Sequence, residues 1–314
     1  MAVYTSVKES EIELFLKQYN LGSLISYEGI LEGIENTNYK INTNEGSFIL
    51  TLFEKRVDPK DLPFFMSLQQ HLSDNNFMCP IPIKNKDNNV VNTLCNKKAI
   101  IISFLEGKKI EQIKPEHCLQ IGEMISNFQF LNKNFNHKRK NNLLINDWNK
   151  IFLKCLKVTD HKFLNLIDVV KNELIFLEQN WPKNLPNGII HGDIFQDNVF
   201  FKEDTFSGLI DFYFSCNDFY AYELALTTNA WCFSKQNLFL NENFESLIKG
   251  YSKLSKINNE EIKYFNILLR GAAIRILVTR LHDQLFHPAG AIVKPKDPLE
   301  YYNILKWHQE NKIF

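Results

Sequence analysis

Hydrophobic and polar residues alternate through much of the first hundred residues, a pattern typical of strands. The alternation around Tyr39 and Ile41, a turn at residues 44–46 and a second run from Phe48 to Phe53 predict a hairpin. A second hairpin is expected where the apolar runs VVNTL and AIIISFL flank the polar NKK. Helical spacing interrupts the strands near residue 12 and in the stretch DLPFFMSLQQHLSDNNF.

The pattern changes after Glu106-Gly107, where apolar residues begin to recur every three to four positions. Helices are expected from Pro115 onward, through residues 143–181, and again from Tyr222 to the C-terminus. Strand signals return only around residues 189–211. The second part of the chain is therefore predicted to be mainly helical.

This change predicts an α+β fold with two lobes. We expect a small β-rich lobe over residues 1–104 and a larger α-rich lobe over residues 105–314. Hydrophobic residues make up 45% of the chain, enough for a substantial core. The 36 basic and 36 acidic residues balance, so charge indicates neither a nucleic-acid partner nor an anionic membrane. The sequence gives no indication of an oligomeric state.

The cysteines and the N-terminus indicate a reducing compartment. Six widely spaced cysteines include no C-x-x-C pair, which argues against a zinc site or a redox pair. The opening MAVYTSVKES lacks the basic start and apolar run of a secretory signal. No apolar run approaches the roughly 20 residues that span a bilayer. We therefore expect reduced thiols and a cytoplasmic location.

One stretch, IIHGDIFQDNVFF at residues 189–201, places polar side chains between two apolar runs. Asp193 is followed five residues later by Asn198, and Asp211 follows a strand, a turn and a second strand. Kinases use an Asp, an Asn five residues on and a later Asp to position the attacking hydroxyl and to hold Mg²⁺ on ATP. A solvated turn is the alternative, but the combined spacing favours phosphoryl transfer with Asp193 as base and Asn198 and Asp211 as metal ligands. His191 is expected to order the loop through hydrogen bonds.

The His-Gly-Asp form resembles the aminoglycoside phosphotransferase and choline kinase superfamily. Further segments resemble its homoserine kinases, and they extend over most of the chain: IENTNYKI, FILTLFE, GLIDFYFSCNDFYAYELA, NAWCF, GAAIRILVTRL and PKDPLEYYNIL. The resemblance implies a bilobal protein-kinase-like fold and ATP, with Mg²⁺, as cofactor. It also implies that L-homoserine is phosphorylated on its side-chain hydroxyl, a step of threonine biosynthesis.

Neither a Walker loop nor a Rossmann fingerprint occurs, so the phosphates need another cover. Small and amide residues in the first hairpin would let backbone N–H groups approach phosphate oxygens; these are Gly33, Asn36 and Asn38. By resemblance to kinases, the adenine would meet the joint after the last strand of the small lobe. Its positions are Ser103, Phe104, Leu105 and Glu106.

Two departures from the kinase pattern stand out. The strand lysine that binds phosphates in kinases corresponds to Thr51, and Lys55 or Arg56 are alternatives at the strand end. The usual Asp-Leu-Ala after the metal loop is Glu-Leu-Ala, in which Glu223 is expected to play a structural part.

A substrate carboxylate favours arginine, whose planar fork donates two hydrogen bonds. Arg270, Arg275 and Arg280 are candidates, but at ~100° per residue they cannot share one helix face. Arg275 and Arg280 lie in the segment that resembles homoserine kinases and are favoured over Arg270, with a surface or interlobe ion pair as the alternative role for each. For the substrate ammonium, the candidates are Asp197, Asp218 and Asp283.

Two other hypotheses remain at this point. The chain could be another small-molecule kinase of the same fold, acting on an aminoglycoside or on choline. It could also be an inactive binding protein, which the missing strand lysine would favour and the intact Asp193, Asn198 and Asp211 argue against.

Overall fold

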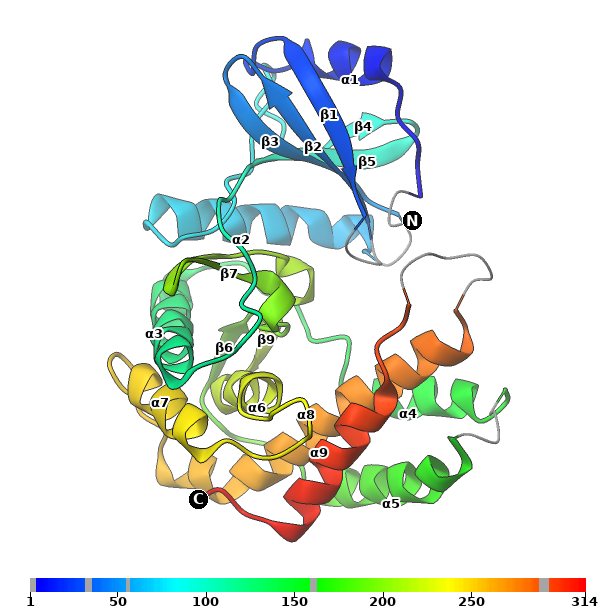
Figure 1. The fold of residues 1–314 in the computed structure, drawn as a ribbon, viewed down its shortest axis with the longest axis vertical. Helices are drawn as coiled ribbons and strands as arrows, with labels where there is room; N and C mark the ends of the chain where they lie inside the picture. Colours follow the sequence, from blue (N-terminus) through cyan, green and yellow to red (C-terminus); the bar gives the residue numbers. More distant parts are fainter. Residues whose placement is uncertain (1–3, 32–35, 55–56, 159–162, 288–293) are drawn as a thin grey trace. The chain divides into compact units, whose positions relative to one another are not determined.

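The computed structural model describes the chain except for residues 1–3, 32–35, 55–56, 159–162 and 288–293 (Figure 1). The chain forms two compact units. The first comprises residues 1–107 with two later segments, 207–213 and 290–294. The second comprises residues 108–206, 214–289 and 295–314.

The first unit is built on a five-stranded antiparallel sheet with strand order β1-β2-β3-β5-β4. Its strands are β1 (Leu24–Ile30), β2 (Thr37–Thr43), β3 (Gly46–Leu52), β4 (Asn92–Leu94) and β5 (Lys97–Ser103). Both expected hairpins, β2–β3 and β4–β5, are confirmed. Gly46 has a φ of +139°, a backbone conformation that side chains disfavour, which explains the glycine at this turn.

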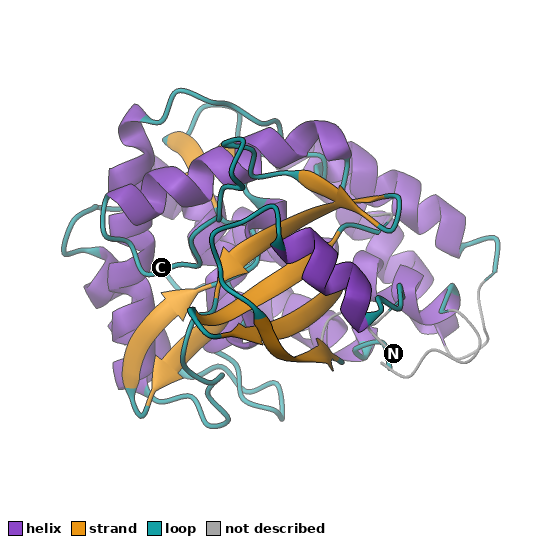
Figure 2. Ribbon diagram, turned by 90° about the horizontal axis from the view of Figure 1, so that it is seen from above, coloured by secondary structure: helices purple, strands orange, loops and turns teal. Residues whose placement is uncertain are grey.

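One face of this sheet packs on the helix α1 (Glu9–Leu16) to form the core of the unit (Figure 2). Alternation along the strands sends Tyr39 and Ile41 of β2 and Leu50 of β3 to the same face. Helical spacing brings Ile12 and Phe15 of α1 to meet them. The opposite face of β2 and β3 is left with more polar residues.

The helix α2 (Leu62–Asp74) and the segment 207–213 also belong to the first unit. The ring of Tyr213 meets Phe53 and Phe65 edge to face, with centroids 5.2 and 5.5 Å away. The backbone N–H of Leu209 donates to the carbonyl of Met78 over 3.0 Å. These contacts fix the segment that carries Asp211.

The second unit is mainly helical, as the spacing of apolar residues predicts. Its helices are α3 (Pro115–Leu131), α4 (Ile145–Cys155), α5 (Leu164–Asn180), α6 (Tyr220–Trp231), α7 (Asn241–Tyr251), α8 (Asn259–Leu285) and α9 (Pro298–Glu310). The short antiparallel strands β6 (Asn187–Ile190) and β9 (Cys216–Phe219) accompany them. Strands β7 (Val199–Lys202) and β8 (Thr205–Leu209) form a separate two-stranded sheet. The strand β9 was not predicted, because CNDF has no apolar alternation. In the described part of the chain, no helix is long and apolar enough to cross a membrane.

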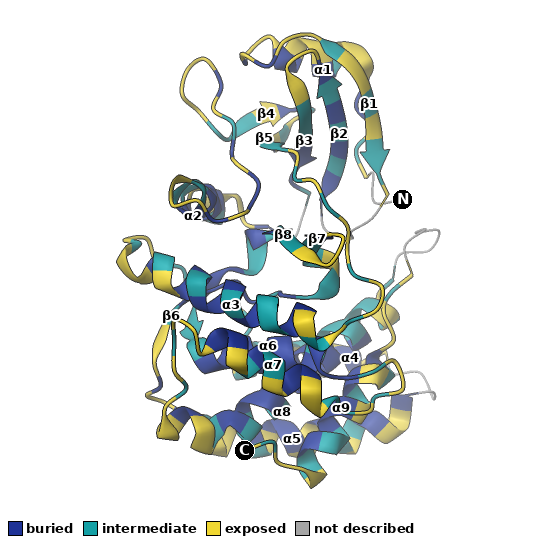
Figure 3. Cartoon of the chain, turned by 60° about the vertical axis from the view of Figure 1, so that its left-hand side comes forward, coloured by how far each residue is buried: buried dark blue, intermediate teal, exposed yellow. Residues whose placement is uncertain are grey.

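Helices α6 and α8 form the centre of the second unit, and α6 is buried over nearly its whole length (Figure 3). Helix α8 contacts α4, α6 and α9. Its start is fixed by a capping box in which Asn258 and Glu261 each accept the other's backbone N–H over 2.9 Å. Gly271 faces Trp181, where an added Cβ would come within 2.2 Å of the indole ring. A glycine is therefore required for this contact.

A buried ion pair joins α5 to α8. Arg270 donates two hydrogen bonds to Glu173 over 2.6 and 2.7 Å, and Gln309 of α9 donates to the same carboxylate over 2.7 Å. The side chain of Glu173 is 2% exposed and that of Arg270 is 15% exposed. Three helices thus depend on one carboxylate.

We expect Glu173→Gln to lower the free energy of unfolding by about 3 kcal/mol, because Arg270 would be left without an anionic partner in a buried position. Urea denaturation measures this change. The matched control is Glu260→Gln, which breaks the exposed pair with Lys263 and should shift stability by less than about 1 kcal/mol. Equal effects of the two substitutions would contradict the assignment.

Candidate active site

The loop at residues 191–198 connects β6 to β7 in the second unit. Gly192 has a φ of +77°, and a Cβ there would lie 3.0 Å from the carbonyl oxygen of Phe214. Both the backbone conformation and the lack of space favour glycine at the position where protein kinases have arginine.

Glu223, in the first turn of α6, holds the start of this loop. Its fully buried carboxylate accepts the backbone N–H of His191 and, over 3.0 Å, that of Gly192. Burial raises the pKa of Glu223 to about 7, against the opposing effect of these N–H groups. The side chain of His191 is also buried, with the ring of Phe128 at a centroid distance of 6.4 Å.

Asp193 and Asn198 lie next to each other within the 191–198 loop. The Asn198 Nδ2 group donates to the Asp193 carboxylate over 2.7 Å and to the Asp193 carbonyl over 2.9 Å. Because a carbonyl can only accept, the amide must turn its nitrogen toward Asp193, and its Oδ1 remains available as an oxygen ligand. Burial raises the pKa of the half-buried Asp193, while Arg275 and then Asn198 oppose the rise.

The three arginines of α8 have different surroundings, as their spacing predicts. Arg270 pairs with Glu173. Arg280 pairs with Glu300 over 2.6 Å and lies 4.5 Å from the Tyr301 ring. Arg275 is 4% exposed, and within the described residues no carboxylate lies at ion-pair distance from it.

Arg275 nevertheless acts on the carboxylates around it. Its guanidinium lies 5.5 Å from the centre of the Phe214 ring. Burial raises the pKa of both Asp193 and Asp218, and the charge of Arg275 opposes this rise. The guanidinium therefore acts electrostatically on both carboxylates, although neither lies at ion-pair distance from it.

The three acids considered for an ammonium group also differ. Asp197 is paired with Lys296 over 2.6 Å and with Lys109 at 3.8 Å. Asp283 lies 3.6 Å from His282. The third, Asp218, receives hydrogen bonds and no ion pair from the described residues; Asn141 Nδ2 donates to it over 2.6 Å and the Phe219 N–H over 2.7 Å.

The expected nucleotide residues belong to the first unit. Gly33, Lys55 and Arg56 lie outside the described residues. Asn36 accepts the Glu54 N–H over 3.4 Å, and Thr51 donates its hydroxyl to Asn38 over 2.7 Å. The side chain of Thr51 is buried, and its hydroxyl is used in this hydrogen bond to β2.

The joint positions continue from the end of β5. Ser103 accepts the Ile81 N–H through its hydroxyl over 2.8 Å, the Phe104 N–H donates to Ser47 over 3.3 Å, and Leu105 and Glu106 follow. The Lys40 ammonium lies 4.6 Å from the centre of the Phe104 ring. Sequence reasoning missed Lys40, although strand alternation places it on the same face as Asn38.

Asp211, the second acid expected at a metal, lies at the end of β8 in the first unit and has a φ of +64°. This left-handed conformation is uncommon outside glycine, and Asp tolerates it better than most residues. Within the described residues no group of three or more His, Cys, Asp or Glu side chains is arranged as a metal site. A metal would therefore need the Asn198 oxygen or a bound ligand besides carboxylates.

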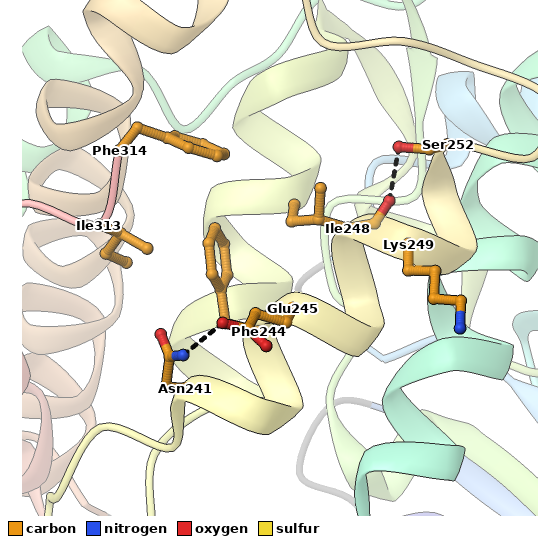
Figure 4. A pocket seen from close by; sticks show the side chains of 8 residues that line it. All are labelled: Asn241, Phe244, Glu245, Ile248, Lys249, Ser252, Ile313 and Phe314. Carbon is orange, nitrogen blue, oxygen red and sulfur yellow. Dashed lines mark hydrogen bonds between the residues drawn. The ribbon is translucent and has the colours of Figure 1, made fainter.

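A separate depression lies on the second unit, between α7 and the C-terminal residues Ile313 and Phe314 (Figure 4). Its volume is about 410 Å³, and Phe244, Ile248 and Lys249 are among its lining residues. None of the expected site residues lines it. The depression therefore has no part in the arrangement around Asp193.

The stability of the protein should report the ionisation of Glu223. Because its pKa rises from 4.5 to about 7 on folding, the stability contributed by this group is complete below pH 4.5 and is lost as the pH rises through about 7. The free energy of unfolding, relative to that of Glu223→Gln, should fall by roughly 3 kcal/mol between about pH 4 and about pH 8. Urea denaturation across this range measures it, and a pH-independent difference would contradict the assignment.

Comparison with known proteins places this geometry in a family. The model of the phosphotransferase enzyme family (APH) matches residues 26–257. A homoserine kinase of Parvibaculum lavamentivorans is 43% identical over 98% of this chain and 96% of its own length. A homoserine kinase of Rhizobium meliloti is likewise 43% identical, over 98% of this chain and 95% of its own.

Solved structures agree in fold at low sequence identity. An amicoumacin kinase in complex with AMP-PNP and Ca²⁺ has a TM-score of 0.74 and 13% identity, covering 98% of this chain and 95% of that one. A choline kinase from Cryptosporidium parvum has a TM-score of 0.68 and 13% identity, covering 96% of each chain. The α+β kinase-like fold is therefore confirmed, and the chain belongs to the phosphotransferase enzyme family, alongside the homoserine kinases that it matches over nearly its full length.

Proposed function

We propose that this chain is an ATP-dependent homoserine kinase. It transfers the γ-phosphoryl group of ATP to the side-chain hydroxyl of L-homoserine and yields O-phospho-L-homoserine, which supplies threonine biosynthesis. The observation that carries the proposal is the 43% identity to homoserine kinases over 98% of the chain. An aminoglycoside or choline kinase of the same fold is the alternative. The buried Arg275, which no described carboxylate neutralises at ion-pair distance, argues against it, because choline has no carboxylate for the guanidinium to bind.

In the proposed reaction, Asp193 orients the homoserine hydroxyl and accepts its proton. The hydroxyl oxygen forms the new bond to the γ-phosphorus while the bond between that phosphorus and the bridging oxygen breaks, and ADP leaves with the electron pair. Burial supports this role, because an Asp193 with a raised pKa is a stronger base than an exposed carboxylate.

The proposed metal ligands are the Oδ1 atom of Asn198 and the carboxylate of Asp211. Both offer oxygen, the donor that Mg²⁺ prefers, and the hydrogen bonds from Asn198 to Asp193 leave its oxygen available. When bound, Mg²⁺ neutralises charge on the phosphate oxygens of ATP. His191 keeps the proposed role of ordering the loop.

For the nucleotide we propose Gly33, Asn36 and Asn38 at the phosphates and the backbone of residues 103–106 at the adenine. For the substrate carboxylate we propose Arg275, whose guanidinium is buried and is not neutralised at ion-pair distance by a described carboxylate. Arg280 contributes a charge near Asp197 and joins α8 to α9 through Glu300. We place the reaction in the cytoplasm, where ATP is supplied and the six free cysteines stay reduced.

The first test follows ADP release with Mg·ATP and, in turn, L-homoserine, L-serine, choline and kanamycin. ADP release should depend on L-homoserine, and Asp193→Asn should lower kcat by roughly a hundredfold to ten-thousandfold with little change in ATP binding. Turnover of choline or kanamycin instead of homoserine would overturn the substrate assignment. A near-wild-type rate for Asp193→Asn would overturn the assignment of the base.

A second prediction concerns the arginines. Arg275→Gln should raise the KM for L-homoserine roughly 10- to 100-fold, because a charge-assisted carboxylate contact is lost, while the KM for ATP changes little. Arg280→Gln is the matched control on the same helix, since its partner Glu300 is 52% exposed. If Arg280→Gln raised the KM for homoserine more than Arg275→Gln does, the two roles would have to be exchanged.

A further inference from the structure

We infer that Asp218, oriented by Asn141, binds the α-ammonium group of the substrate and forms a zwitterion-binding site with Arg275. This inference rests on the proposed function and deepens it, because it assigns the residues that select an α-amino acid over a simple amine or a hydroxy acid. All three residues belong to the second unit.

The position of Asn141 is fixed by the segment that precedes it. The Arg139 N–H donates to the Asn217 side chain over 2.9 Å, and the Asn217 N–H donates back to the Arg139 carbonyl over 2.7 Å. The Arg139 guanidinium also donates to the Ser215 carbonyl over 3.1 Å. The segment is thus bound along β9, and this brings the Asn141 amide to the Asp218 carboxylate.

Asp218 is held in place by these contacts but is not neutralised by them. Each of its two oxygens accepts one hydrogen bond, one from the Asn141 amide over 2.6 Å and one from the Phe219 N–H over 2.7 Å. An ionised carboxylate can accept about four, so each oxygen keeps a free acceptor position. Among the described residues no Lys, Arg or His nitrogen lies at ion-pair distance from Asp218.

Arg275 and Asp218 are therefore opposite charges that act on each other without forming a direct pair. The charge of Arg275 lowers the pKa of Asp218, while burial raises it. Burying a charge without an opposite charge in contact costs free energy, and this applies to Arg275 and to Asp218. A bound zwitterion would neutralise both, because its carboxylate would contact Arg275 and its ammonium would contact Asp218.

The other acids fit an ammonium less well. Asp197 already shares its carboxylate between Lys296 and Lys109, so a third cation would meet a net positive charge. Asp283 lies on α8 with the His282 ring nitrogen 3.6 Å from its carboxylate. Asp218 combines a partly buried carboxylate with an electrostatic link to Arg275.

The test compares L-homoserine with two analogues that each lack one charged group. 4-Hydroxybutyrate lacks the ammonium, and 3-aminopropan-1-ol lacks the carboxylate. For Asp218→Asn we expect kcat/KM to fall roughly 10- to 100-fold with L-homoserine and with 3-aminopropan-1-ol, and to stay within about threefold with 4-hydroxybutyrate. For Arg275→Gln the pattern should invert, with 4-hydroxybutyrate losing rate and 3-aminopropan-1-ol keeping it.

Asn141→Ala provides a second variant that leaves the carboxylate in place. It should show the same selectivity with a smaller loss, because Asp218 is less well oriented. Asp283→Asn is the matched control and should leave all three rates unchanged. The inference would be overturned if both Asp218→Asn and Asn141→Ala lost kcat/KM equally with all three compounds. It would also be overturned if neither variant lost kcat/KM with any of them. The proposed function fails separately, if the wild-type protein does not turn over L-homoserine.

Discussion

The arrangement around Asp193 depends on one buried carboxylate, that of Glu223. It accepts the backbone N–H groups of His191 and Gly192, and so it fixes the path of the chain just before Asp193. Two main-chain donors that would otherwise be buried without partners are satisfied by a residue 32 and 31 positions away from them. The same helix, α6, packs against α8, which carries Arg275. The proposed base and the proposed anion-binding residue are therefore both supported by α6, which is buried over nearly its whole length.

Much of the fold follows from periodicity. The hairpins of the first unit were predictable because Tyr39, Ile41 and Leu50 must share a buried face, and the helices of the second unit because their apolar residues recur every three to four positions. The strand β9 was not predictable, because it pairs with β6 through backbone hydrogen bonds and its sequence CNDF shows no alternation of apolar and polar residues. Hydrogen bonds from residues 139–141 to Asn217 and Asp218 account for the polar residues of that strand.

In the candidate site, individual residues were easier to predict from the sequence than the partners that they contact. The spacing of Asp193 and Asn198 predicted a pair in the same loop, and the two side chains share a hydrogen bond of 2.7 Å. No local pattern could show that Arg280 forms an ion pair with Glu300 while Arg275 forms none with a described carboxylate. The ion pair of Arg280 depends on the packing of α8 against α9. The contact of Asn141 with Asp218 could not be predicted from the sequence either, because the two residues are 77 positions apart in the chain.

The helix α8 also limits how this protein can change through evolution. Arg270 and Arg280 are tied to Glu173 and Glu300, and these attachments fix the rotation of the helix about its own axis. Inserting or deleting one residue between Arg270 and Arg280 would turn one end relative to the other by about 100°, so one of the attachments would be broken. Arg275, between them, would be carried away from Asp193 by the same rotation. New substrate preferences should therefore arise by substitution at position 275 and its neighbours, while the length of this helix stays constant among descendants.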